Sequence, residues 1–190
     1  MTFAIKYGRL NYAKPVKFIS EFNMKKWKTY ILTCIWGPLL IVQIVLVFVS
    51  GRVKEAGLDL VMYIGWVIWA ISVVLGWLPI FVLKSKGGVL KGESYVHTTT
   101  LVKTNIYAIV RHPQYTAGIL FSLALVFISQ NWLIAVMGAV VIVLLYIDIL
   151  MTDKYEIEKF DNEYKDYMRK VPRTNFILGI IRLLRRSKRE

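Results

Sequence analysis

The strongest constraint on this chain is the length of its apolar runs. Residues 29–50 and 58–83 each exceed the roughly 20 residues that a helix needs to cross about 30 Å of hydrocarbon. Helices are expected because lipid offers no partner to an unpaired backbone amide or carbonyl. Two further runs, 115–129 and 132–150, are separated by only two residues, which predicts a tight helical hairpin. The sequence therefore predicts an all-α integral membrane protein with about four transmembrane helices, the last two forming the hairpin.

The composition supports a membrane protein over a nucleic-acid-binding one. The chain is 56% hydrophobic and has a mean hydropathy of +0.51, yet its formal net charge is +13. A basic soluble protein would not need so much continuous apolar sequence, so the charges are expected in segments outside the lipid. The single cysteine, Cys34, excludes an intramolecular disulfide and a cysteine-based metal cluster, and we predict no metal site.

The distribution of basic residues predicts how the chain is oriented. Lys and Arg number seven in residues 1–28, five in 84–113 and eleven in 151–190, but only two in 51–57. By the positive-inside rule, both termini and the loop before the third apolar run face the cytoplasm. We therefore expect a multi-pass integral membrane protein whose active site is also cytoplasmic.

At 190 residues the chain is expected to form a single membrane domain, 1–190. It would comprise a basic cytosolic N-terminal segment (1–28), two transmembrane helices (29–83), and a core with a cytosolic loop and C-terminal amphipathic helices (84–190). In that last part, the sequence FILGIIRLLRRSKRE combines an apolar face with a basic end, which is typical of a helix lying on an anionic membrane surface.

Polar residues that could carry chemistry concentrate in the loop 84–115. This loop is too long for a simple turn, and it contains both histidines, His97 and His112. It ends in RHPQY, which places Arg111 at the membrane edge. A structural role alone is possible there, because arginine can reach lipid phosphates and a proline suits the first turn of a helix.

The combined pattern resembles the integral-membrane methyltransferase family, which includes isoprenylcysteine carboxyl methyltransferases and phospholipid methyltransferases. The resemblance covers roughly residues 87–173. It rests on LVKTNIYAIVRHPQYTAG followed, after one hairpin, by an acidic segment that ends in FDNEYKDYMRKVPR. It implies S-adenosylmethionine (SAM) as the methyl donor and a lipophilic, membrane-embedded acceptor, either isoprenylcysteine-like or a lipid headgroup. The expected partners are thus a lipophilic small molecule or lipidated substrate and membrane lipid, with no nucleic acid.

The resemblance also implies roles for individual residues. Arg111 would be the catalytic residue that orients the acceptor. The residues expected to bind the cofactor are Leu101, Val102, Tyr107, His112, Pro113, Tyr115, Asp153 and Glu156, with His97 as a further candidate.

Two positions depart from the family pattern. The family's acidic segment opens with a Glu-Glu pair, where this chain has Thr152 and Asp153. The carboxylate that meets the amino group of SAM is then either Asp153, by position, or Glu156, one turn further along the helix. Asn105 replaces the usual glycine before Tyr107, and asparagine is among the few residues that tolerate a positive φ.

Two alternatives have different functional consequences. Membrane sterol reductases use a similar RHPNYxG sequence, so an NADPH-dependent lipid or sterol reductase is possible, although Gln114 replaces the asparagine of that motif. A non-enzymatic membrane adaptor that has lost cofactor binding is the other alternative, and the missing Glu-Glu pair favours it.

Overall fold

The computed structural model describes residues 31–188, so the predicted basic segment 1–28 lies outside the described part of the chain. Within that part every regular element is helical. The elements are the helix Ile31–Val49, which ends in the π-helix η1 (Val45–Val49), and then α2 (Asp59–Lys86), α3 (Ile106–Ile109), α4 (Pro113–Ser129), α5 (Trp132–Lys170) and α6 (Phe176–Ser187).

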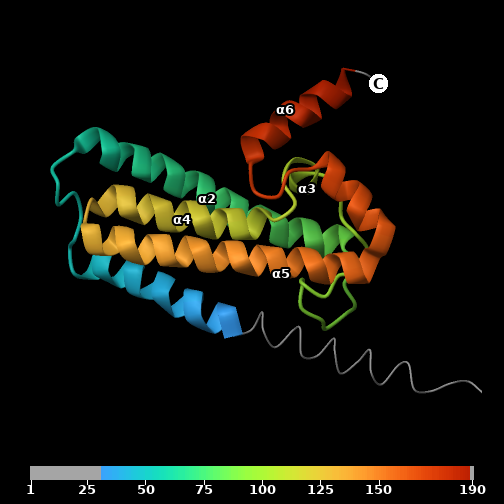
Figure 1. The fold of residues 1–190 in the computed structure, drawn as a ribbon, viewed down its shortest axis with the longest axis horizontal. Helices are drawn as coiled ribbons and strands as arrows, with labels where there is room; N and C mark the ends of the chain where they lie inside the picture. The colour runs from blue at the N-terminus through green and yellow to red at the C-terminus, as the bar shows by residue number, and fades with distance from the viewer. Residues whose placement is uncertain (1–30, 189–190) are drawn as a thin grey trace, which may run out of the picture.

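The long helices form a bundle in which α4 packs against both α2 and α5 (Figure 1). Among the described residues, the helix Ile31–Val49, α2 and α5 are long and apolar enough to cross a membrane, and α4 is a shorter apolar helix of 17 residues. The predicted all-α membrane fold with about four apolar helices is therefore confirmed.

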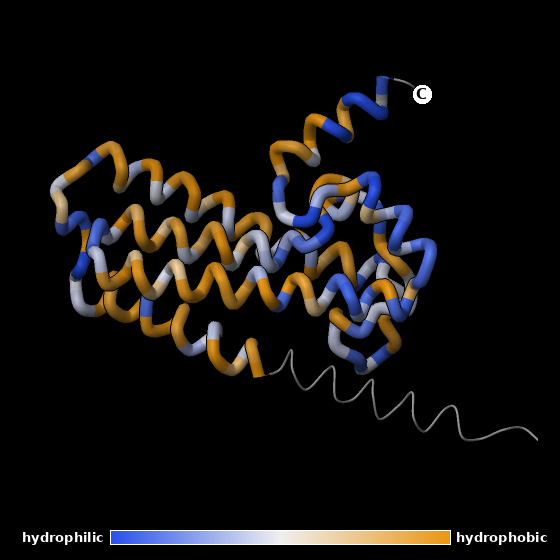
Figure 2. Tube along the Cα trace, in the orientation of Figure 1, coloured by the Kyte–Doolittle hydropathy of each residue, from blue (hydrophilic) through white to orange (hydrophobic). Residues whose placement is uncertain are grey.

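Apolar and polar residues are segregated along the bundle. Apolar residues dominate most of its length, whereas hydrophilic residues gather where α2 ends and α4 begins (Figure 2). We call this end of the bundle the site end. It also contains α3, the loop that follows α2, and the charged second half of α5 (Figure 1). The predicted polar loop thus lies against the ends of the membrane helices.

Small and polar residues hold the apolar part of the bundle together. A Cβ at Gly65 of α2 would lie 2.9 Å from Ile128 of α4, so glycine allows these two helices to approach closely. Gln43 is fully buried, donates to the Ile134 carbonyl at 3.1 Å and accepts from the Ser122 hydroxyl at 2.9 Å. Its amide links the helix Ile31–Val49 to α4 and α5, where unpaired polar groups would be costly.

The connection between α4 and α5 is the predicted tight hairpin. Gln130 takes a left-handed conformation at the end of α4, with φ 55° and ψ 28°. Asn131 then caps α5, since its side-chain oxygen accepts from the amides of Leu133 and Ile134. Two polar residues therefore suffice to reverse the chain.

The helix α5 continues well beyond its apolar run and then changes direction. It ends at Lys170, two residues before Pro172, but Asp161 has non-helical backbone angles of φ 44° and ψ −122°. The charged segment 152–171 keeps a helical period up to Pro172, which by itself favours a continuous helix. The break at Asp161 interrupts that helix and redirects the last turns of α5 (Figure 1).

Candidate active site

The RHP motif lies in a short extended stretch between α3 and α4. Its backbone pairs with the chain that follows α5: the Arg111 amide donates to the Pro172 carbonyl at 3.0 Å, and the His112 amide donates to the Arg173 carbonyl at 3.2 Å. Pro113 occupies the first turn of α4, where its missing N–H leaves no intrahelical hydrogen bond unmade. Two segments distant in sequence are thereby fixed side by side.

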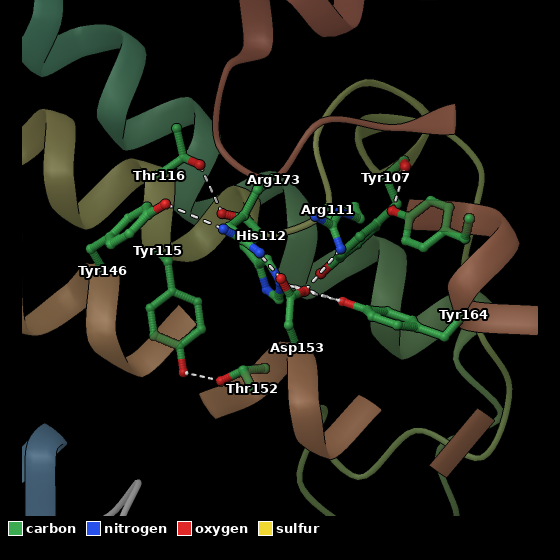
Figure 3. Close-up of polar contacts among 11 residues, drawn as sticks. Tyr107, Arg111, His112, Tyr115, Thr116, Tyr146, Thr152, Asp153, Tyr164 and Arg173 are labelled. Carbon is green, nitrogen blue, oxygen red and sulfur yellow. Dashed lines mark hydrogen bonds and ion pairs between the residues drawn. The ribbon is translucent and has the colours of Figure 1, made fainter. Parts of the chain in front are cut away.

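The carboxylate of Asp153, on α5, is the centre of the site (Figure 3). Its Oδ1 accepts from Arg111 Nη1 at 3.0 Å, from His112 Nε2 at 2.7 Å and from the Tyr164 hydroxyl at 2.7 Å. Its Oδ2 accepts from Arg173 Nε at 2.7 Å. Asp153 therefore joins α5 to the RHP motif and to the segment before α6, and its acceptor capacity is largely used by these four donors.

The cluster around Asp153 is shielded from solvent. Arg111 is 8% exposed, His112 6% and Asp153 3%. Burial is the main cause that lowers the pKa of His112, and the neighbouring Arg111 and Arg173 act in the same direction, while Asp153 opposes them. The imidazole is therefore neutral at physiological pH and donates through Nε2 to the carboxylate.

One donor in the cluster has no partner. Arg111 uses Nη1 for the ion pair with Asp153, and its guanidinium lies 5.9 Å from the centre of the Tyr164 ring. Its Nε is buried and finds no acceptor among the described residues. A buried N–H without a partner is costly, so this atom is a candidate contact for a bound anion or carbonyl.

Glu156 lies one turn beyond Asp153 on α5 and is the other carboxylate that the sequence suggested. No hydrogen bond to it occurs in the described part of the chain, although the charge of Lys159 acts on it. Its own charge acts on the phenols of Tyr107, Tyr164 and Tyr167, so it belongs to the same end of the bundle as these tyrosines. A partly buried carboxylate in such a region is suited to bind a cation.

The two predicted tyrosines, Tyr115 and Tyr107, lie on different sides of Asp153 (Figure 3). The Tyr115 hydroxyl is 3.1 Å from the Thr152 hydroxyl, and the Tyr115 ring packs edge-on against His112. The Tyr107 carbonyl accepts from the Tyr167 hydroxyl at 2.6 Å. Burial raises the pKa of the Tyr107 phenol well above its usual range, so it stays neutral.

The remaining predicted residues take different positions. Val102 is buried in an apolar cluster with Ile106 and Val110, and Leu101 packs against Tyr164 and Tyr167. Both therefore support the site with apolar side chains.

His97 is not drawn into the cluster. Its side chain is nearly half exposed, and its Nδ1 is bonded to Glu93 at 2.6 Å within the loop. Among the described residues no group of three or more His, Cys, Asp or Glu side chains could hold a metal ion.

Tyr164 and Arg173 belong to the site but were not selected from the sequence. In a straight helix Tyr164 would lie about 16 Å along the axis from Asp153, at 1.5 Å per residue. The break at Asp161 turns the chain back and brings the two side chains together. The signal that could have found Arg173 is the conspicuous KVPR sequence, in which a basic residue follows the helix-ending proline.

The family of the chain follows from a comparison of its sequence with known families. A sequence model of the phospholipid methyltransferase family matches residues 60–163. This chain belongs to the phospholipid methyltransferase family. The match runs from α2 into the charged part of α5 and includes Arg111, His112, Asp153 and Glu156. No curated protein and no solved structure matches the chain.

Family membership confirms the resemblance seen in the motifs. It indicates a methyltransferase that acts on membrane lipid, in agreement with a bundle of apolar helices that carries a buried polar cluster at one end.

Proposed function

We propose that this chain transfers a methyl group from SAM to a lipophilic acceptor that reaches the site from the bilayer. The observation that carries the proposal is the contrast between two neighbouring carboxylates at the site end. Asp153 is occupied by four protein donors, whereas Glu156 has no hydrogen-bond partner among the described residues.

A carboxylate without a hydrogen-bond partner among the described residues, together with nearby tyrosines, fits the chemistry of SAM. That molecule carries an ammonium group, a carboxylate and a sulfonium cation beside an adenosine. We assign the ammonium to Glu156, the one of the two candidate carboxylates that remains available. Tyr107 and Tyr115 supply aromatic faces for the sulfonium or the adenine.

When bound, SAM would supply an electrophilic methyl group, and the chain's own residues would position it and exclude water. The transferred group carries dispersed charge, so alignment and a dry site supply most of the catalysis. We assign Asp153 the role of fixing Arg111 and His112 relative to α5. His112 is neutral and already donates to Asp153, which makes it a positioning residue.

Arg111 is our candidate for the residue that orients the acceptor. Its guanidinium is held by Asp153, and its buried Nε is left to donate to an oxygen of a lipid headgroup or of another acceptor. A headgroup phosphate or carbonyl oxygen would satisfy this donor. This assignment keeps Arg111 in contact with the substrate while Glu156 contacts the cofactor.

An apolar groove supports an acceptor with a long hydrocarbon tail. The groove has a volume of about 370 Å³ and lies between the helix Ile31–Val49, α2 and α4. Small residues, among them Gly76 and Gly118, open it between the helices. Ala117, the first α4 residue that lines the groove, is four residues from Pro113, so the groove begins about 6 Å along α4 from the site, at 1.5 Å per residue. A lipid chain in this groove would leave its headgroup near Arg111.

The orientation inferred from the basic residues completes the proposal. With the site end in the cytoplasm, SAM would enter from the cytoplasm and the acceptor from the membrane. The expected partners are thus a soluble cofactor on one side and a membrane lipid or lipidated substrate on the other.

The test is ligand-induced thermal stabilisation of the purified protein in detergent, comparing SAM, S-adenosylhomocysteine and NADPH. We expect stabilisation by the two SAM-type ligands, because a ligand that binds only the native state raises its apparent stability. Glu156→Gln should weaken SAM binding by about tenfold, the size expected for losing one charge-assisted hydrogen bond.

Glu163→Gln is the matched control, because Glu163 is an exposed carboxylate of the same helix that pairs with Lys103. It should bind SAM like the unmodified protein. Stabilisation by NADPH alone would support the reductase alternative instead. Stabilisation by SAM that Glu156→Gln leaves unchanged would contradict the assignment of Glu156.

A further inference from the structure

The helix α6 has an apolar stripe that nothing in the described part of the chain covers. Ile177, Ile180, Ile181 and Leu184 follow the spacing of one helical face, and they are between 41% and 61% exposed. The bundle contacts a different side of α6, where Gly179 lies against Ile109. The helix extends away from the bundle beside α3 (Figure 1).

Basic residues lie next to this stripe. Residues 167–188 contain no Asp or Glu, and they carry seven basic side chains, of which Arg182, Arg185 and Arg186 lie on α6 itself. Figure 2 shows the apolar and hydrophilic residues alternating along this helix. An apolar face flanked by arginines is complementary to a surface with an apolar interior and anionic headgroups.

We infer that α6 docks on the surface of the anionic leaflet next to the site end, with Ile177, Ile181 and Leu184 in the lipid and Arg182 and Arg185 at the headgroups. The inference depends on the exposed stripe and the adjacent charge, and it does not depend on the proposed methyl donor or acceptor. The bundle places α6 on α3 beside the ends of α2 and α4, where a bilayer surface is expected if these helices cross the membrane.

Docking of α6 has a direct connection to the site. A Cβ at position 179 would clash with the Ile109 carbonyl, so only glycine allows α6 to lie this close to α3. The segment just before α6 donates and accepts within the site: Arg173 pairs with Asp153, and the carbonyls of Pro172 and Arg173 accept from the RHP backbone. A membrane-bound α6 would therefore hold Arg173 in place over Asp153.

The experiment uses the full chain in lipid nanodiscs with a solvent-sensitive fluorophore on Leu184→Cys. The background is Cys34→Ser, because Cys34 is the only native cysteine. Bilayers of phosphatidylcholine alone are compared with bilayers that also contain phosphatidylglycerol. In the anionic bilayer we expect blue-shifted emission and a quenching constant for aqueous iodide about threefold lower, because the labelled face leaves water.

Two variants and a second probe site serve as controls. Arg182→Gln/Arg185→Gln should restore quenching in the anionic bilayer, whereas Lys165→Gln/Arg169→Gln, which removes the same charge from exposed positions of α5, should not. A probe on Ser94→Cys, in the exposed loop, should be quenched equally in both bilayers.

Three results would overturn the inference. The first is equal quenching at Leu184→Cys in both bilayers, which would show that α6 does not dock on anionic lipid. The second is an equal gain of iodide quenching in Lys165→Gln/Arg169→Gln, which would show that only the net charge of the protein matters. The third is disulfide cross-linking between two Leu184→Cys chains at high yield, which would show a second copy of the chain on the stripe.

Discussion

At the scale of single residues, the site depends on how one carboxylate is shared. Asp153 lies between the cations Arg111 and Arg173 and accepts from His112 and Tyr164 as well. A buried charge is tolerated only when it is paired and hydrogen-bonded, so these groups stabilise one another and would be costly separately. Glu156 has no such hydrogen bond within residues 31–188, which is why the two acidic residues are assigned different roles.

Asp153→Asn should lower the free energy of unfolding by about 3 kcal/mol, because it leaves the buried guanidinium of Arg111 without a counter-charge. Thermal unfolding of the purified protein without ligand measures the effect. Asp166→Asn is the control, since Asp166 pairs with Arg169 on an exposed surface and should change stability little. Equal stability of the two variants would contradict the central position of Asp153.

Stability should fall as the pH is lowered from about 7 to 5, because the pKa of His112 lies below its unfolded value near 6.5. The unfolded chain then binds a proton that the native state does not. The contribution of neutral His112 to the free energy of unfolding is therefore complete above pH 6.5. It decreases as the pH falls toward the pKa of His112 in the native state, by up to about 1.4 kcal/mol per pH unit. Unfolding midpoints across this range measure it.

In this pH series, His97→Gln should keep the fall and His112→Gln should remove it, because His97 is partly exposed and outside the cluster. A stability that is constant or rises on acidification would show that His112 is not buried as a neutral group.

The sequence was informative for the residues in short motifs and less so for their contacts. Arg111, His112 and Asp153 were all selected, and the structure brings them together. That they bind one another could not be foreseen, because the motif shows which residues are present and not which donors reach the same oxygen. Tyr164 was missed because its approach depends on the positive φ of Asp161, which the helical period of the charged segment conceals.

At the scale of elements, the apolar runs predicted the helices well because lipid admits few other structures. The runs 58–83 and 132–150 correspond to α2 and to the apolar part of α5, and the hairpin falls at Gln130 and Asn131 as expected. The short loop elements were not predictable in the same way. The four-residue α3 was not foreseen, although the positive φ that the sequence allowed for Asn105 just before it is present, with φ 57° and ψ −130° in a region that favours glycine.

Asn105→Gly should raise the free energy of unfolding by about 1 kcal/mol, because asparagine is strained in this conformation and its side chain makes no capping hydrogen bond to α3. Thermal unfolding without ligand measures it. Asn162→Gly, at an exposed position within α5, should instead destabilise the chain, since glycine is unfavourable in a helix. A destabilised Asn105→Gly would contradict the positive φ at this turn.

At the scale of the whole molecule, the bundle places an apolar groove and a polar cluster next to each other. The groove opens between the helix Ile31–Val49, α2 and α4, and the cluster lies where α4 begins. A lipid with its tail in one and its headgroup at the other would be held at two points, which is the arrangement that a methyltransferase acting on membrane lipid requires.

Gly76→Leu should fill the groove and raise the KM for the lipid acceptor by about tenfold, with SAM-induced stabilisation unchanged, because Gly76 lines the groove and has room for a Cβ. Ala70→Leu is the control, at an exposed position of α2 outside the groove. Steady-state methylation at varied acceptor concentration measures it. An unchanged KM in Gly76→Leu would show that the lipid acceptor does not bind in the groove.

The proposed methyl transfer is tested most directly by following an isotopically labelled methyl group from SAM into lipid extracted from nanodiscs that contain the protein. We expect label in the lipid fraction for the unmodified chain and for Glu163→Gln, and at least about a tenfold lower rate for Glu156→Gln. If the protein binds SAM but no label appears in any lipid or lipidated acceptor, the proposed methyl transfer is wrong and a non-enzymatic role is supported.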